Sequence, residues 1–90
     1  TYWRAHAETE QPLKAWYQTV KSASWTSMND VQTAMPKARV LNAERVRFEI
    51  CGGNYRLIAA FFFPGRAAWI KFIGTHADYD RIDALTVDQF

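Results

Sequence analysis

Two turn signals divide the second half of the sequence into three runs of strand-forming residues. From 45 to 50 charged and apolar residues alternate in RVRFEI, and this period of two predicts a strand with one buried face. CGGN at 51–54 predicts a turn, YRLIAAFFF at 55–63 a second strand, PG at 64–65 another turn, and RAAWIKFI at 66–73 a third strand. Since such short connections join antiparallel neighbours, the chain is expected to form an antiparallel sheet of three or more strands.

Helical patterns precede this sheet. In PLKAWYQTVKSA apolar residues recur at i, i+3, i+4 and i+7, which predicts an amphipathic helix over about 11–23. In SMNDVQTAM, Ser27 and Asp30 have the spacing of a helix cap, so a short second helix is expected to begin there and to end before Pro36.

A third capping pattern follows the last predicted strand. Thr75 lies directly after Gly74 and three residues before Asp78, which predicts a short C-terminal helix. The expected fold class is therefore α+β, with two N-terminal helices packed on the antiparallel sheet and a short helix at the end. Ninety residues suffice for one small domain, so 1–90 are expected to form a single domain.

The basic residues are concentrated in the middle of the chain. Residues 37–71 hold seven basic residues against two acidic ones, a net charge of +5 within a chain whose total is +2. The seven are Lys37, Arg39, Arg45, Arg47, Arg56, Arg66 and Lys71. Clustered positive charge favours a polyanionic partner such as nucleic acid, although solvated surface arginines are an alternative explanation.

Pairing the predicted strands assigns their side chains to two faces. With turn centres at 52–53 and 64–65, Phe48 pairs with Leu57, Leu57 with Phe72, and Ile58 with Lys71. The helix-covered face is expected to carry Val46, Phe48, Ile50, Tyr55, Leu57, Ala59, Phe61, Ala68, Ile70 and Phe72. The opposite side, which we call the second face, is expected to carry Arg45, Arg47, Glu49, Arg56, Ile58, Ala60, Trp69 and Lys71.

The C-terminal helix adds two side chains that can take part in proton transfer. His76 and Tyr79 are three residues apart, hence on one side of the helix, and they follow Lys71 closely in the sequence. Ribonuclease chemistry needs a group that takes the 2′-OH proton, cations that hold the phosphate, and an acid for the leaving oxygen. Two structural interpretations remain open: His76 bonded to the backbone or to Asp80, and Tyr79 packed against the edge of the sheet.

Other chemistries have little support. His76 with Asp80 and Asp83 lacks a second histidine at metal-ligand spacing, so neither a metal site nor a cofactor is expected. Cys51, the single cysteine, lies in a turn without an adjacent base and is expected to be an ordinary thiol. The chain has no run of eighteen apolar residues and no signal peptide pattern, which favours a cytoplasmic protein without membrane contact.

Four strings resemble one known family in the same order. They are EQPLKAWY at 10–17, SASW at 22–25, NYRLIA at 54–59 and, most specific, KFIGTHADYDRID at 71–83. The chain is similar to the HigB toxins of type II toxin–antitoxin modules, which belong to the RelE-like mRNA interferases. The resemblance implies a RelE-like fold with a short strand upstream of the first helix. Since the chain starts at Thr1 without methionine, that strand is expected to be missing.

The resemblance also implies an activity and partners. It implies a metal-independent endoribonuclease that cleaves mRNA on the ribosome during translation by attack of a 2′-OH on the adjacent phosphate. It further implies inhibition by a HigA-type antitoxin, through which alone operator DNA would be contacted. A non-catalytic RNA- or ribosome-binding module is the alternative, and a protein-interaction domain is a third possibility.

The family's functional residues map onto particular positions of this sequence. The resemblance implies that Arg56 and Lys71 hold the phosphate with help from Arg47, that His76 is the acid or the base, and that Tyr79 orients or stacks on a nucleotide. The RNA-binding set is Arg45, Arg47, Arg56, Lys71 and Trp69. In FFFPGR the chain departs from the family, so the function of Arg66 is open, and contact with a partner is an alternative to core packing for 61–63.

Overall fold

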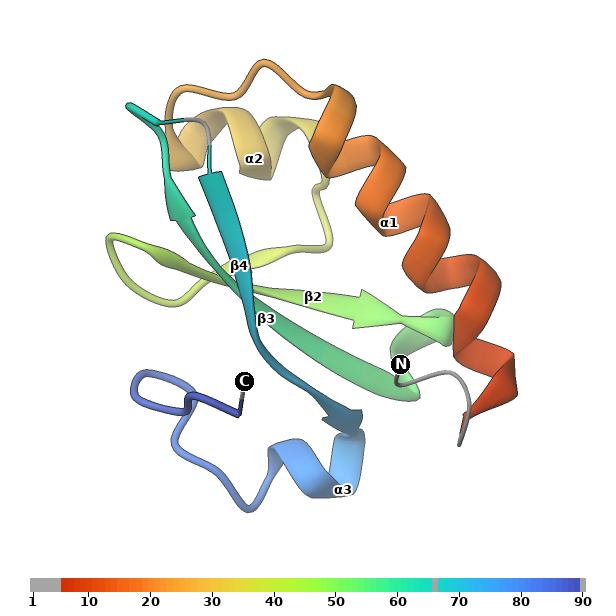
Figure 1. Ribbon diagram of the computed structural model, residues 1–90. Helices are drawn as coiled ribbons and strands as arrows, with labels where there is room; N and C mark the ends of the chain where they lie inside the picture. Colours follow the sequence, from red (N-terminus) through yellow and green to blue (C-terminus); the bar gives the residue numbers. More distant parts are fainter. Residues whose placement is uncertain (1–5, 66, 90) are drawn as a thin grey trace.

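The computed structural model describes residues 6–65 and 67–89, which form a four-stranded antiparallel sheet with helices on both of its sides (Figure 1). The elements are η2 (Ala7–Thr9), α1 (Glu10–Ser22), α2 (Met28–Ala34), β1 (Arg39–Val40), β2 (Arg45–Ile50), η3 (Cys51–Gly53), β3 (Tyr55–Phe62), β4 (Ala67–Thr75) and α3 (His76–Tyr79). Strands follow the order β1-β2-β3-β4. The predicted α+β class is confirmed, whereas the prediction that the chain lacks a strand upstream of the first helix concerns residues outside the described ones.

Helices α1 and α2 lie on one side of the sheet, and α3 with the chain that follows it lies on the other (Figure 1). Helix α2 begins as predicted, because the hydroxyl of Ser27 accepts a hydrogen bond of 3.3 Å from the amide of Asp30. It ends two residues before Pro36, since the residue before a proline is disfavoured in helical geometry. The sequence prediction missed β1, whose two residues are too few to show a period.

The main core fills the space between the helices and the helix-covered face. Its buried residues are Leu13, Trp16, Val31, Ala38, Val46, Phe48, Ile50, Tyr55, Leu57, Ala59, Phe61 and Ile73. The ring of Trp16 meets Phe48 edge-on at 5.3 Å, which joins α1 to the centre of the sheet.

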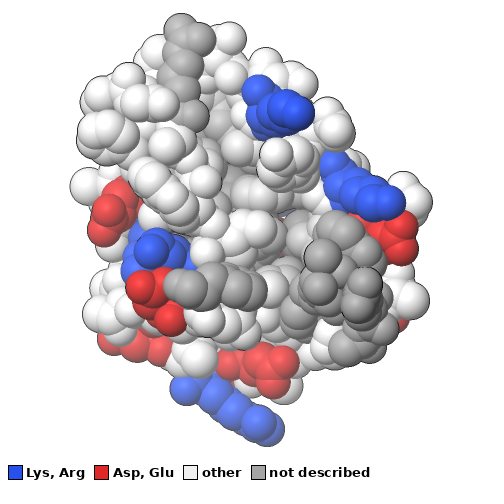
Figure 2. Space-filling view, in the orientation of Figure 1, with Lys and Arg blue, Asp and Glu red and all other residues white. Residues whose placement is uncertain are grey.

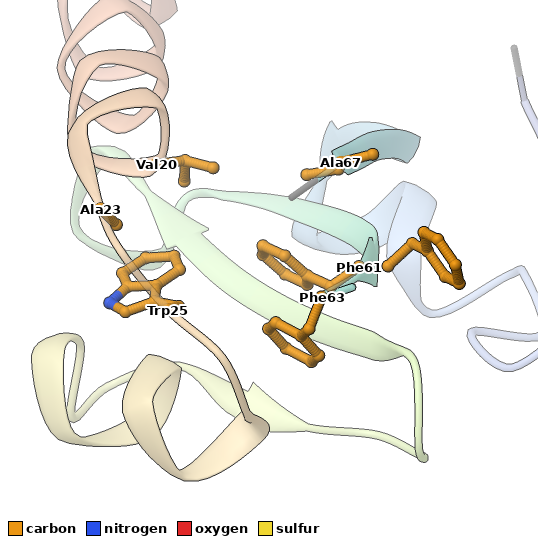
Figure 3. Close-up of a pocket in the computed structure, with 8 residues that line it drawn as sticks. Val20, Ala23, Trp25, Phe61, Phe63 and Ala67 are labelled. Atoms are coloured by element: carbon orange, nitrogen blue, oxygen red, sulfur yellow. The ribbon is translucent and has the colours of Figure 1, made fainter. Parts of the chain in front are cut away.

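At the far end of the core, Phe61 stacks on Phe63 at 5.6 Å between ring centroids, and Trp25 meets Phe61 edge-on at 6.0 Å (Figure 3). Of the two alternatives for 61–63, core packing is the one that the structure shows for Phe61 and Phe63, which pack inward. Only Phe62 between them is exposed, because successive side chains of a strand point to opposite faces.

Strand register agrees with the prediction on one side of β3 and differs on the other. Phe48 pairs with Leu57 as predicted. Between β3 and β4, however, the predicted pairs of Ile58 with Lys71 and of Leu57 with Phe72 are wrong, because Lys71 is an extra residue in a β-bulge. Ile58 instead pairs with Phe72, and Leu57 with Ile73. Phe72 consequently belongs to the second face, and Ile73 takes its place in the main core.

Candidate functional site

The second face carries three arginines on two neighbouring strands. Arg45 and Arg47 come from β2 and Arg56 from β3, and the register places them opposite Ala60, Ile58 and Glu49 respectively. Lys71 joins them from the bulge of β4. Alternation along the strands therefore gathers the predicted cations on the side of the sheet that faces away from α1 and α2.

This face is covered by residues 80–89, which we call the C-terminal segment. The guanidinium of Arg45 donates from Nη1 to the carbonyl oxygens of Ala84 at 3.2 Å and Val87 at 2.7 Å. The amide of Gln89 donates to the carbonyl of Lys71, and the side-chain oxygen of Gln89 accepts from the amide of Ile73, both at 2.9 Å. Arg45 is therefore only 7% exposed, rather than part of an open basic surface.

The covering segment is acidic. Among the described residues from 76 to 89, Asp78, Asp80, Asp83 and Asp88 are opposed by Arg81 alone among Lys and Arg. In Figure 2 acidic side chains gather over the lower part of the molecule, where Figure 1 places α3 and the C-terminal segment. Of these carboxylates, that of Asp88 lies next to a cation of the second face, 3.5 Å from Lys71.

The three arginines keep hydrogen-bonding capacity that the fold does not use. The Nε atoms of Arg45, Arg47 and Arg56 are buried and have no hydrogen-bond partner within the described chain. Arg56 is 9% exposed and donates from Nη1 to the carbonyl of Gly53 at 2.5 Å, with Glu49 3.7 Å away. Buried donors without partners are costly in a purely structural layer, which makes this face a candidate site for an anion.

Lys71 is less buried than Arg45 and Arg56. Its Nζ lies 3.5 Å from a carboxylate oxygen of Asp88, at the outer limit of a hydrogen bond, and its side chain is partly exposed. Trp69, two residues earlier on β4, is among the exposed large hydrophobic residues. An ion pair this exposed contributes little to stability and exchanges readily with another anion.

His76 is held at the first position of α3. Thr75 and Asp78 form the predicted capping box, and the amide of His76 donates to the carbonyl of Asn54 at 3.1 Å. Its Nδ1 lies 3.2 Å from a carboxylate oxygen of Asp80, so the contact with Asp80 that we considered as a purely structural role of His76 is present. The side chain is 57% exposed, and Nε2 has no hydrogen-bond partner among the described residues, so this nitrogen is accessible to a bound molecule.

Tyr79 packs on the second face. Its ring lies 6.3 Å from that of Phe72, and the guanidinium of Arg47 lies 5.7 Å from its centroid. The packing interpretation of Tyr79 is therefore confirmed, and the contact with Arg47 links α3 to β2.

The predicted residues do not form one compact cluster. Five positions of extended chain separate Lys71 from His76, roughly 16 Å along the strand. In the described residues no contact joins His76 to Lys71 or to Arg56.

Cys51 has the properties expected of an ordinary thiol. Its Sγ lies 3.2 Å from the carbonyl of Glu8, and burial, followed by the charge of the Glu8 carboxylate, raises the pKa of the thiol. A raised pKa lowers the fraction of nucleophilic thiolate. In the described parts of the chain, no three metal-ligating side chains are grouped suitably for an ion, and no helix is both long and apolar enough to span a membrane.

Fold and site together define a small α+β protein with a cluster of cationic side chains on one face of its sheet. A model of the HigB toxin family, described as the RelE-like toxic component of a toxin–antitoxin system, matches residues 9–82. Since the match spans most of the chain, the protein belongs to this family, as the resemblance predicted. Membership makes it the toxin of such a system and implies an antitoxin partner. No curated protein matches the chain.

Proposed function

We propose that this toxin is a translation-dependent mRNA endoribonuclease and that the second face is its RNA-binding surface. The observation that carries the proposal is the set of three buried guanidinium Nε atoms without partners, beside a weakly paired lysine. Guanidinium donors match the geometry of phosphate oxygens, and an RNA backbone supplies a row of them.

The reaction needs only groups that the chain and the RNA provide. The 2′-oxygen of the substrate attacks the adjacent phosphorus, its proton passes to a base, the bond to the 5′-oxygen breaks, and an acid protonates that oxygen. The products are a 2′,3′-cyclic phosphate and a 5′-hydroxyl. His76, exposed and without a partner at Nε2 in the described chain, is the group that we assign to one of these proton transfers.

The cations stabilise the charge that develops on the phosphate. Lys71 takes this role most directly, because a phosphate oxygen can replace the carboxylate of Asp88 at 3.5 Å. Arg56 and Arg47 contribute positive charge on the same face, and Tyr79, whose ring lies 5.7 Å from the guanidinium of Arg47, orients the nucleotide. Arg45 binds the C-terminal segment through two carbonyls, so we assign it a positioning role in addition to its predicted contribution to RNA binding.

The partners follow from the same assignment. The substrate is mRNA on the ribosome in the cytoplasm, and a HigA-type antitoxin of a type II module neutralises the toxin. Operator DNA is contacted only through that antitoxin. A protein that must stay inactive until its antitoxin is lost has reason to keep its cationic face covered, and the C-terminal segment supplies such a cover.

The test is a cell-free translation reaction programmed with one mRNA, to which the purified full chain is added. Cleavage that depends on translation and leaves 2′,3′-cyclic phosphate ends is expected, and added antitoxin should stop it. Cosedimentation with ribosomes in the absence of cleaved mRNA would instead identify a non-catalytic ribosome-binding module.

A further inference from the structure

A second feature of this side of the sheet has no role in the chemistry above. A hollow of about 350 Å³ lies near the β3–β4 turn, beside Lys71. Its lining residues are Glu44, Ala60, Phe61, Phe62, Trp69 and Lys71. It therefore combines exposed aromatic rings with one acidic and one basic side chain.

The pairing of β3 with β4 explains why the hollow exists. Ala60 pairs with Trp69, and Phe62 pairs with Ala67, so Phe62 and Trp69 are diagonal neighbours on the same face. Ala60 is small and buried, which leaves space between the larger side chains. Both rings are 53% exposed, and neither makes a ring contact with another aromatic of the described chain. Two such rings side by side form a surface on which a planar group can stack.

Glu44 is fixed at the rim by its backbone. The amide of Phe61 donates to the carbonyl of Glu44 at 2.7 Å, and the amide of Glu44 donates to the side-chain oxygen of Asn42 at 2.9 Å. Its side chain is exposed and forms no ion pair within the described residues. An exposed carboxylate without an ion-pair partner can accept two hydrogen bonds from one ligand.

We propose that this hollow binds a single unstacked nucleobase of the RNA, with guanine preferred, and that Glu44 determines the preference. The inference rests on the proposed function, because the nucleotide belongs to the strand that Lys71 holds. Trp69 and Phe62 stack on the base, as aromatic side chains do in single-stranded RNA recognition. Lys71, which also lines the hollow, lies where it can meet the phosphate of that nucleotide.

Guanine is selected by its hydrogen-bonding edge. Its N1–H and N2–H groups are adjacent donors that a carboxylate accepts together, as in other bidentate pairs. Adenine and cytosine each offer one amino group beside an acceptor that repels the carboxylate, and uracil offers one N–H between two carbonyls. Glu44 thus favours guanine by attraction and disfavours the other three by repulsion.

The direct test is a titration of the isotope-labelled full chain with GMP, AMP, CMP and UMP, followed by NMR. GMP should shift the indole signal of Trp69 and the amide signals of Glu44 and Ala60 at the lowest concentration. Glu44→Gln should weaken GMP binding about 10-fold, in line with the loss of one bidentate base contact, and leave AMP binding unchanged. Glu10→Gln on α1, whose partner is Lys14, is the matched control and should change neither.

Stacking is tested by two variants of one residue. Trp69→Ala should weaken the binding of all four nucleotides about 5-fold or more, and Trp69→Phe should restore most of it, because base stacking tolerates any aromatic ring. Shifts that map away from the hollow, or equal binding of all four nucleotides with Glu44→Gln unchanged, would overturn the proposal. Loss of antitoxin binding in Trp69→Ala, without any GMP binding to the parent, would also overturn it and identify the hollow as a protein-docking surface.

Cleavage is measured separately, so that the two proposals fail independently. If the parent chain cleaves mRNA but does not bind GMP in the hollow, the proposed base site is ruled out and the proposed nuclease function stands. If the parent chain binds GMP there but never cleaves a translated mRNA, the proposed nuclease function is ruled out and the base site stands.

Discussion

The two faces of the sheet are covered in different ways. On the helix-covered face α1 and α2 bury an apolar layer, with Trp16 packed edge-on against Phe48. On the second face the cover is a short helix and ten residues of irregular chain, held by an arginine, carbonyl oxygens and a glutamine. Packing stabilises the first layer, whereas directional contacts to polar groups hold the second.

The difference shows where the fold serves something other than stability. Replacing buried charges by apolar groups of similar size is often neutral or stabilising, so three guanidinium groups with unused donors are a poor choice for a structural layer. Departures from good packing are expected at functional sites. The second face is therefore the side of this molecule on which a ligand is expected.

The largest expected effect is a difference in stability between substitutions on the two faces of the sheet. Phe48→Ala should lower the free energy of unfolding by about 3–5 kcal/mol, because it removes the aromatic ring at the centre of the main core. Trp69→Ala on the second face should change it by less than about 0.5 kcal/mol, since that side chain is exposed. Urea titration of both variants measures the contrast, and similar losses would show that the second face is equally structural.

The next effect is a loss of mRNA cleavage when a residue on the side of the second face is replaced. His76→Ala should slow mRNA cleavage about 100-fold or more, as the loss of a general acid or base does, and leave ribosome binding intact. His76→Gln should not restore cleavage, since an amide forms hydrogen bonds but exchanges no proton. Rates in a translation reaction, with ribosome cosedimentation in parallel, measure both properties. Full activity of both variants would leave His76 as a structural residue of α3.

A smaller effect concerns the cover of the second face. Arg45→Ala should lower the free energy of unfolding by about 1–3 kcal/mol, because two hydrogen bonds from a charged donor are lost. The amide of Gln89, which bonds the carbonyl of Lys71, should then exchange its hydrogen faster. Arg39→Ala on the exposed strand β1 is the control. Equal rates of amide hydrogen exchange at Gln89 in the parent, Arg45→Ala and Arg39→Ala would show that Arg45 does not hold the C-terminal segment.

The smallest effect is a pH dependence on the helical side. Hydrogen bonds from the amide and the hydroxyl of Thr26 lower the pKa of Asp30 below its ordinary value. A lowered pKa in the folded state means that this contribution to stability is complete above the ordinary pKa and is lost as the pH falls through the folded one. Asp30→Asn should remove that part of the loss of stability at low pH, measured as the unfolding temperature at a series of pH values. The same pH dependence in the parent and in Asp30→Asn would contradict this contribution of Asp30.

Periodic features of this fold could be predicted from the sequence. The alternation in β2, the spacing of α1, and the capping pairs Ser27 with Asp30 and Thr75 with Asp78 act over a few residues, so each is visible in the local sequence. The assignment of the three arginines to the second face followed from the same alternation.

The bulge and the C-terminal segment could not be predicted in this way. Lys71 carries no local mark of an inserted residue, and the resulting slip moved Phe72 to the second face. The contacts of Arg45 with Ala84 and Val87 span about forty positions and use backbone carbonyls, which any residue type provides. Consequently the sequence indicated which cations share a face, but not that Arg45 and Arg56 are buried beneath a cover.

The central claim is that the second face, and not the helical side, acts on RNA, and Lys71 tests it most directly. In a translation reaction Lys71→Ala should cleave mRNA about 10- to 1000-fold more slowly than the parent, because the cation that holds the phosphate is lost. Lys21→Ala, which removes a lysine lying over Tyr17 on α1, should cleave at the parental rate. A Lys71→Ala chain that is folded and cleaves as fast as the parent would contradict the account.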